Sequence, residues 1–402
     1  MSADGPPGRA APPRPEDGYR PALRPGVLVS GEVLHGPRRV HLVKDTTSGQ
    51  SFQVGVKEHF LIARMDGTRT PDEIGAAYAR TYGKRLGEGH WRQILGLLGG
   101  RGLLASGPAP SGPSGTAGAG GGDASGDAEA PGGRTAGGPG TKPGRNGVLA
   151  GSVRLVADAH ATAGRLHDAL GFLLARRWAL PLLFLVTVMA LVLAWHVGEL
   201  ATGAVELFRH PVLLTAGATL LWLSTALHEL AHGLVARHYG GRVGEIGLRW
   251  RFPVVIMYCT VEDYLYLPGR TARIATALAG AVTNLLFLLP FFAVWALARP
   301  AGATGQALGG FLFLGTLQAL AMLVPLPPLD GYKVVGQLLG TAELAASSRR
   351  YVALALRRDP EAARYPPRAR RAYRAYAAGS VVVVLLLLTG AVLLVRHVLT
   401  TA

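Results

Sequence analysis

The chain has 402 residues, a formal net charge of +16 and a hydrophobic content of 49%, which allows two or three domains. In a soluble protein this charge would point first to nucleic acid, but the basic residues here flank long apolar runs. That placement favours anionic membrane lipids and argues against nucleic-acid binding. The single cysteine, Cys259, excludes an intrachain disulfide and a cysteine-based zinc site, so any metal must be held by His, Asp or Glu.

The N-terminal part of the chain predicts one small folded domain between two flexible segments. Residues 1–25 are rich in Pro and Gly and predict a disordered tail without a signal peptide. Residues 26–105 carry strand-like runs followed by helical segments, which indicates a soluble α+β domain of winged-helix-like order. One helix is expected to begin with a capping box between Thr70 and Glu73. Residues 106–148 are mostly Gly, Ala, Pro and Ser and predict a disordered linker.

Residues 149–402 predict a membrane domain, because apolar runs recur that are long enough to cross a bilayer. A buried core helix is the alternative for any single run, but five runs in one chain make it a poor explanation for all of them. The expected spans lie near residues 178–197, 212–236, 272–298, 311–329 and 377–395. The predicted fold class is therefore mainly α: a polytopic membrane protein with about five transmembrane helices after a small α+β domain.

The distribution of basic residues predicts the orientation of this membrane domain. Arg and Lys crowd the segments 237–271 and 333–376, whereas the expected loops 198–210 and 299–310 carry one Arg each. Basic loops stay on the cytoplasmic side of a membrane. We therefore expect a multi-pass protein of a bacterial plasma membrane, with its N-terminal domain in the cytoplasm and its C-terminus outside.

The sequence His228-Glu229-Leu230-Ala231-His232 lies inside the second apolar run. Two His residues four positions apart share one face of a helix and can grip one ion, and the intervening Glu can take a proton from the attacking water. Zinc is the expected metal, since a hydrolase needs a Lewis acid without redox chemistry. Surface polar residues are the alternative, but His and Glu in a membrane span are costly unless they are paired, hydrated or metal-bound.

A third ligand is expected from another span, and Asp330 is the carboxylate at the end of the fourth. The prolines before it break the helix there, and spans two and four both run inward, so Asp330 and His232 should lie at the same depth. The alternative for Asp330 is an Asp-Gly turn that merely ends a helix.

Residues 258–273, with the pair Glu262-Asp263, resemble the putative peptide zinc metalloprotease branch of the site-2 protease family of intramembrane zinc metalloproteases. Three further sequence elements together resemble the family as a whole. They are His-Glu-Leu-Ala-His-Gly at 228–233, Ala-Gly-Ala-Val-Thr-Asn at 279–284 and Pro-Pro-Leu-Asp-Gly at 327–331. The resemblance covers roughly residues 178–340. It implies that His228, His232 and Asp330 bind Zn²⁺, that Glu229 is the general base, and that Asn284 positions the substrate or the oxyanion.

The resemblance implies a zinc metalloendopeptidase that cleaves a membrane-associated protein or a peptide precursor near the cytoplasmic face. The alternating residues of 245–267 could form a re-entrant hairpin that pairs with substrate, or an interfacial loop. Residues 26–105 resemble a PqqD-like domain, which implies a leader peptide as a partner. A non-catalytic, protease-like membrane protein for peptide export or immunity is the alternative, although the intact Glu229 argues against it.

Overall fold

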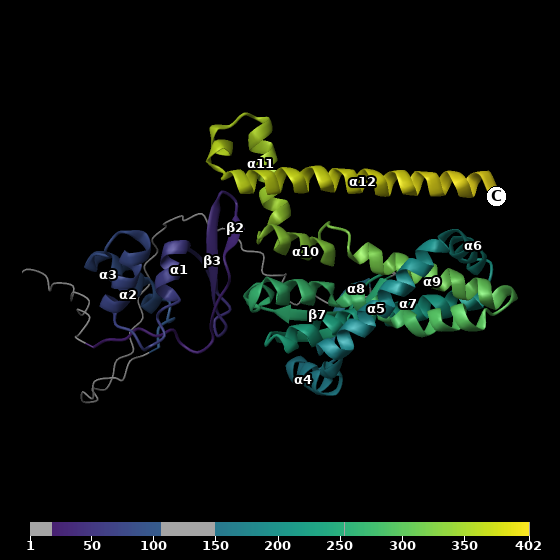
Figure 1. Ribbon diagram of the computed structural model, residues 1–402, viewed down its shortest axis with the longest axis horizontal. Coiled ribbons are helices and arrows are strands. Elements are labelled where there is room, and N and C mark those ends of the chain that lie inside the picture. The colour runs from purple at the N-terminus through teal and green to yellow at the C-terminus, as the bar shows by residue number, and fades with distance from the viewer. Residues whose placement is uncertain (1–17, 106–148, 253, 402) are drawn as a thin grey trace, which may run out of the picture. The chain divides into compact units, whose positions relative to one another are not determined.

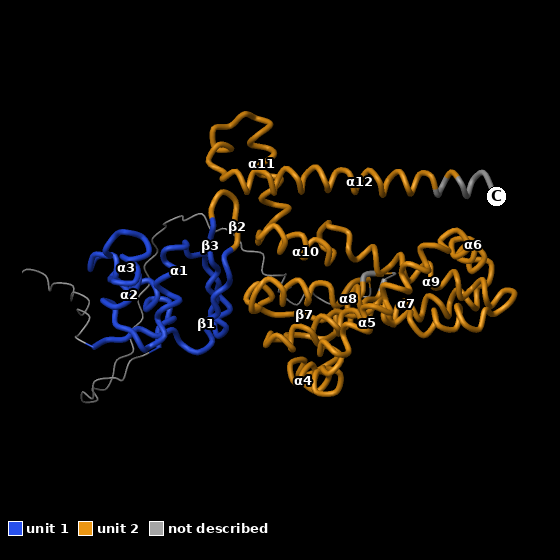
Figure 2. Tube along the Cα trace, in the orientation of Figure 1, with its two compact units in different colours: residues 1–32, 39–136 blue, residues 33–38, 137–402 orange. Residues whose placement is uncertain are grey.

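The chain divides into two compact units, each with its own core. The computed structural model describes residues 18–105, 149–252 and 254–401. The two units comprise residues 1–32 with 39–136, and residues 33–38 with 137–402 (Figure 2). The predicted tail up to residue 17 and the predicted linker over residues 106–148 lie outside the described residues.

The first unit consists of strands followed by helices. Its elements are β1 (Val27–Val29), β3 (Arg38–Asp45), β4 (Ser51–Gly55), α1 (Val56–Ile62), α2 (Pro71–Tyr82) and α3 (Glu88–Gly100). Strands β1 and β4 both pair antiparallel with β3. The predicted capping box is confirmed: the Thr70 hydroxyl accepts from the Glu73 amide at 3.3 Å, and the Glu73 carboxylate accepts from the Thr70 amide at 2.8 Å.

The three helices and the sheet of this unit enclose one apolar core. Its fully buried members include Val43, Leu61, Ile62, Ile74, Leu98 and Leu103. The predicted disordered tail is wrong in its last residues, because the Leu23 amide donates to the Met65 carbonyl at 3.1 Å and the Arg24 amide donates to the Leu103 carbonyl at 2.8 Å. Residues around Leu23 therefore belong to the folded domain, which begins before residue 26.

The second unit contains most of the helices and a small sheet. Its first elements are β2 (Val33–His35), β5 (Ala150–Arg154), α4 (Ala159–Leu170), η1 (Gly171–Leu174), α5 (Arg176–Trp195), α6 (Val197–Leu207), α7 (Pro211–His238), β6 (Arg242–Arg251), β7 (Val254–Glu262) and η2 (Tyr264–Tyr266). The remainder are α8 (Gly269–Ala293), η3 (Val294–Ala298), α9 (Gly302–Met322), α10 (Asp330–Leu339), α11 (Leu344–Leu356), η4 (Pro360–Arg364) and α12 (Pro367–Thr401).

Five helices among the described residues are long and apolar enough to cross a membrane. They are Arg176–Trp195, Pro211–His238, Gly269–Ala298, Gly302–Met322 and Pro367–Leu393. The predicted fold class, a mainly helical chain with five such helices after a small α+β domain, is confirmed. On α12, consecutive apolar side chains from Leu385 to Leu388 are all exposed, as suits a helix surrounded by lipid.

The fourth of these helices differs from its predicted position at 311–329. Helix α9 begins at Gly302 and ends at Met322, before the prolines, and the predicted loop 198–210 is largely helix α6. Glycine lets the two helices touch: a Cβ at Gly203 would lie 2.6 Å from the Gln306 carbonyl oxygen, and one at Gly310 would lie 2.5 Å from the Gly203 carbonyl oxygen. The glycines of α9 therefore serve close helix packing and do not mark a loop.

Helices α7, α8 and α9 pack side by side, and a three-stranded sheet lies against α7 (Figure 1). Strand β6 is central, with β5 and β7 antiparallel on either side. The sequence left a re-entrant hairpin and an interfacial loop open for 245–267, and the structure forms a hairpin of β6 and β7 there, whereas β5 was not predicted. Because β5 occupies one edge of β6, the outer edge of the sheet on the α7 side belongs to β7.

Candidate metal centre

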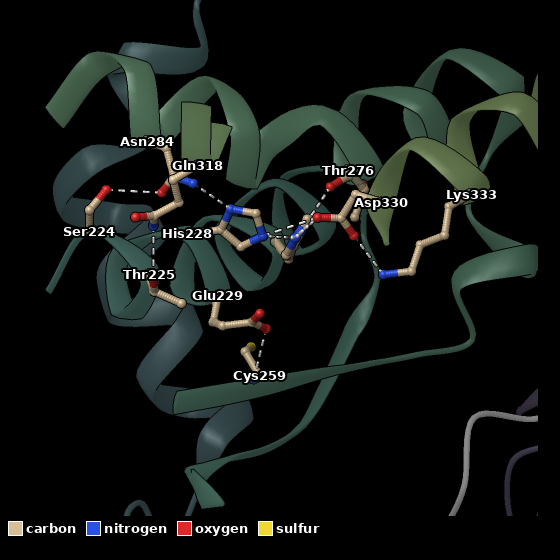
Figure 3. A network of polar contacts seen from close by, with 11 residues as sticks. Ser224, Thr225, His228, Glu229, Cys259, Thr276, Asn284, Gln318, Asp330 and Lys333 are labelled. Atoms are coloured by element: carbon tan, nitrogen blue, oxygen red, sulfur yellow. Dashed lines mark hydrogen bonds and ion pairs between the residues drawn. The ribbon is translucent and has the colours of Figure 1, made fainter. Parts of the chain in front are cut away.

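Helix α7 and the start of α10 bring three potential metal ligands together. His228 and His232 lie one turn apart on α7, and Asp330 is the first residue of α10. Their side chains are buried, with 3%, 6% and 5% of the residue surface exposed, respectively. The Asp330 Oδ2 atom lies 3.0 Å from His228 Nε2 and 3.1 Å from His232 Nε2, and the two nitrogens are 3.2 Å apart (Figure 3).

These three atoms form a nearly equilateral triangle, and their spacing fits a metal ion. A tetrahedral zinc ion with bonds of about 2.0–2.1 Å separates its ligand atoms by roughly 3.3 Å. The two imidazole rings stand almost perpendicular, at 85°, so that both direct one nitrogen towards the same point. The donor set of two imidazoles and one carboxylate is one that zinc accepts in catalytic sites. The buried triad can therefore hold a metal ion.

His232 is held by the backbone of α8. Its Nδ1 atom lies 2.7 Å from the carbonyl oxygen of Thr276, and a carbonyl can only accept a hydrogen bond. The proton of the neutral ring must therefore be on Nδ1, which leaves the lone pair of Nε2 directed at the triangle. Such a partner on the second nitrogen is what fixes the tautomer of metal-binding histidines.

His228 is held by Asn284 on α8, and Asn284 is held by Ser224 on α7. The Asn284 amide nitrogen lies 3.2 Å from His228 Nδ1, and the Ser224 hydroxyl donates to the Asn284 oxygen at 3.0 Å. In this arrangement the ring proton is on Nε2 and is shared with Asp330. Turning the amide by 180° reverses both bonds, because the Ser224 hydroxyl can also accept. Nδ1 then carries the proton, and Nε2 is free for a metal.

Asp330 presents only one oxygen to the triangle, because its other oxygen is already bound. The Lys333 ammonium, one turn along α10, donates to Asp330 Oδ1 at 2.8 Å (Figure 3). Burial raises the pKa of Asp330, but the neighbouring His228 and His232 rings and the charge of Lys333 outweigh it and hold that pKa well below its ordinary range. The carboxylate is therefore charged, as a metal ligand must be.

Two glycines give the ligands their space. A Cβ at Gly280 of α8 would lie 2.4 Å from the His228 ring, so any side chain there would displace the imidazole. A Cβ at Gly331 would lie within 2.5 Å of the Leu323 carbonyl carbon and oxygen, so glycine is needed where the chain after Asp330 passes the end of α9. Both glycines stand in the sequence elements that carry the family resemblance.

Glu229 lies beside the triad and is not part of it. Its side chain is partly exposed and points to the outer edge of β7, where its carboxylate accepts from the Cys259 amide at 3.4 Å (Figure 3). The Cys259 thiol lies close to this carboxylate. Burial, with a contribution from the Glu229 charge, raises the pKa of Cys259 to about 12. Glu229 thus joins the ligand helix to a strand edge, in contact with the sheet.

The structure brings together all five residues that the sequence singled out: His228, Glu229, His232, Asn284 and Asp330. The contacts of one of them, Asn284, differ from those expected. Asn284 was expected to position substrate, but it is 2% exposed and contacts His228 and Ser224, so it is placed to orient a ligand. The sequence reasoning missed the Thr276 carbonyl, Ser224 and the Lys333 contact. A Lys three residues after Asp330 on a helix was the available signal for the last of these.

Comparison of the chain with protein-family models, with curated proteins and with solved structures finds no match. The resemblance to site-2 proteases and to PqqD-like domains therefore stays a prediction from the motifs, and the geometry of the site carries the argument that follows.

Proposed function

We propose that this chain is a zinc-dependent membrane endopeptidase of the site-2 protease type. The observation that carries the proposal is the buried triangle of His228, His232 and Asp330, with Glu229 next to the first ligand and at a strand edge. Structural His pairs have no need of an adjacent carboxylate that faces the outer backbone edge of a strand. Hydrolysis of an extended peptide needs both features side by side.

The residues of the site have distinct roles in this proposal. His228, His232 and Asp330 hold the ion, and a bound zinc ion supplies Lewis acidity for the attack of water on a peptide carbonyl. Glu229 accepts the proton of that water and delivers it to the nitrogen of the leaving amine. The Thr276 carbonyl keeps the His232 ring in the tautomer that binds metal, and Asn284 would do the same for His228 once its amide is turned by 180°. Lys333 keeps Asp330 bound through one oxygen.

The outer edge of β7 is the proposed place for the substrate backbone. Backbone groups of alternate strand residues point to opposite sides, and the Cys259 amide and the Val255 carbonyl both bond to α7. Residues 255, 257 and 259 therefore direct their N–H and C=O groups away from β6. An extended peptide that pairs with this edge passes directly beside Glu229. Strand pairing also solves the problem that a helical substrate hides its carbonyls.

The proposed substrate is a membrane-associated protein or peptide precursor, cleaved near the cytoplasmic face of a bacterial plasma membrane. The helices that could cross a bilayer support a membrane location, and the arginines of 333–376 support a cytoplasmic position for α10 and hence for Asp330. The N-terminal domain would then lie on the same side as the site, where a leader peptide could reach it.

The test uses the full chain in detergent or nanodiscs, with zinc measured by mass spectrometry and peptide precursors from neighbouring genes as substrates. Glu229→Gln should retain zinc and lose cleavage, whereas Asp330→Ala should lose both. Glu199→Gln is the matched control, because that carboxylate lies exposed on α6. Absence of zinc from the unmutated chain would contradict the proposed metal centre. Cleavage by Glu229→Gln at the normal rate would contradict the assignment of Glu229 as the base.

A further inference from the structure

Two side chains of helix α7 reach the outer backbone edge of β7, at two levels. Trp222, Glu229 and Gly233 share one face of α7, since they are separated by seven and four residues. The Trp222 indole N–H donates to the Val255 carbonyl at 2.7 Å, and the Glu229 carboxylate accepts from the Cys259 amide at 3.4 Å. A Cβ at Gly233 would lie 2.8 Å from the Cys259 sulfur and 3.5 Å from the Val243 side chain of β6, so this end of α7 packs on the face of the sheet, and glycine permits the close approach.

The two contacts occupy backbone groups that a substrate strand needs. A strand added to β7 would donate an N–H to the outward carbonyl of Val255 and place a carbonyl against the outward amide of Cys259. Trp222 and Glu229 make those same two bonds with side-chain atoms. Between them, the outward groups of Met257 remain as the part of the edge that neither of these two side chains covers.

An edge of this kind needs a cover when no substrate is present. A strand carbonyl among apolar side chains costs free energy unless it receives a hydrogen bond, and an exposed edge pairs with unrelated strands. The indole supplies one N–H and a large apolar ring, which suits the boundary between protein and lipid. Trp222 and Val255 are 45% and 43% exposed, so the ring can turn outward without opening the core.

We propose that Trp222 is a latch on the substrate edge of β7. The closed latch satisfies Val255 in the resting protein, and an extended peptide opens it by replacing the indole N–H with a backbone N–H. Because Glu229 holds the Cys259 amide on the same edge, a strand that pairs along β7 also releases the carboxylate beside the metal ligands. This regulation rests on the proposed function, and it favours polypeptides that can pair over several residues at once.

The test measures binding to the zinc-loaded full chain in nanodiscs with three probes. Acetohydroxamate binds the metal alone. Two pentapeptides of alternating Val and Thr carry the hydroxamate at the N-terminus or at the C-terminus, and at about 3.3 Å per residue they extend along either direction of the edge. Trp222→Phe keeps an aromatic ring and removes the N–H. Trp195→Phe, at the exposed end of α5, is the matched control.

The latch predicts that Trp222→Phe tightens at least one pentapeptide hydroxamate about 3- to 10-fold, the range for one net hydrogen bond. Acetohydroxamate should bind as in the unmutated chain. The gain should vanish when the backbone nitrogens of the pentapeptide are methylated, because such a peptide cannot pair with a strand. A general loosening of the fold would not distinguish the methylated peptide from the unmethylated one.

The outcomes separate the latch from the function on which it rests. Normal binding of acetohydroxamate with unchanged or weaker binding of both pentapeptides to Trp222→Phe would overturn the latch and leave the metal centre standing. A zinc content near zero, or no binding of acetohydroxamate to the unmutated chain, would overturn the metal centre and the latch together. Equal gains for the methylated and unmethylated peptides would also overturn the latch.

Discussion

Two histidine pairs, one in each unit, make opposite use of the same residue type. His228 and His232 on α7 stand at 85° with ring centroids 4.8 Å apart, and both direct Nε2 at Asp330. His41 and His59 in the first unit lie parallel, at 6°, with centroids 3.4 Å apart, in a stack. A stack directs the ring nitrogens sideways, so they do not converge on one point.

The difference between the pairs comes from the groups that hold the rings. The α7 pair is fixed from outside by Asn284 and by the Thr276 carbonyl, and a carboxylate completes the triangle. In the stacked pair, His41 Nδ1 lies 3.0 Å from the Ser30 carbonyl, and Arg64 acts on His59 as a neighbouring charge. Closeness of two rings therefore does not make a metal site: both rings must direct a nitrogen at one point, where a carboxylate completes the set of ligands.

Of the predicted effects on the two histidine pairs, the largest should come from Gly280→Ala in the α7 pair. The added methyl group would lie 2.4 Å from the His228 ring, so the imidazole must leave the triangle. We expect zinc content and cleavage both to fall by about 100-fold or more, since a ligand and its orientation are lost together. Gly390→Ala on α12 is the matched control, because a Cβ there meets nothing within 4 Å. Normal zinc content in Gly280→Ala would contradict the geometry of the site.

A smaller loss is expected when only the orienting group of His228 is removed. Asn284→Ala should lower zinc affinity about 10- to 100-fold, the usual cost of an outer partner of a metal ligand. Ser224→Ala should act in the same direction and more weakly, because it only holds the amide. Competition with a chelator measures both affinities. Unchanged zinc affinity with impaired cleavage in Asn284→Ala would instead return Asn284 to the substrate role that the family resemblance implies.

The smallest effect should appear at the stacked pair, as a dependence of stability on pH. Burial, the His41 ring and Arg64 lower the pKa of His59 from 6.5 to about 4. Between pH 6.5 and pH 4, His59 is protonated in the unfolded chain but neutral in the folded chain. The free energy of unfolding is therefore highest above pH 6.5 and falls as the pH drops towards 4. With solvent screening the loss should be about 1 kcal/mol. Hydrogen exchange in α1 of the full chain measures it, and His59→Phe should flatten the slope without changing zinc content.

Much of this architecture could be predicted from sequence because its signals are local. The length of the apolar runs predicted the five long helices, and the capping box at Thr70 predicted the start of α2. The spacing of His228 and His232 indicated a shared helix face, and the break before Asp330 indicated a third ligand on another segment. Each inference needed only a few neighbouring residues.

Other features depend on contacts between distant segments and left little trace in the sequence. Residues 299–310 were expected to form a loop, and the contact of Gly310 with α6 explains why glycine stands inside helix α9 instead. The Thr276 carbonyl carries no side-chain signature, so the partner of His232 could not be foreseen. Strand β5 is short and follows a long glycine-rich segment, and its pairing with β6 leaves β7 to supply the edge next to α7.

The division of the ligands between α7 and α10 has a mechanical consequence. Asp330 lies 102 residues beyond His228 in the chain, so an ion bound to both acts as a cross-link across that whole stretch. Closing a loop of such length is entropically unfavourable, and the ion would supply the compensating attraction. Chelation should then free the start of α10 from the bundle and expose it to added trypsin-like proteases, which would cut after Lys333. In the proposed enzyme, the same ion would therefore both stabilise the fold and take part in the reaction.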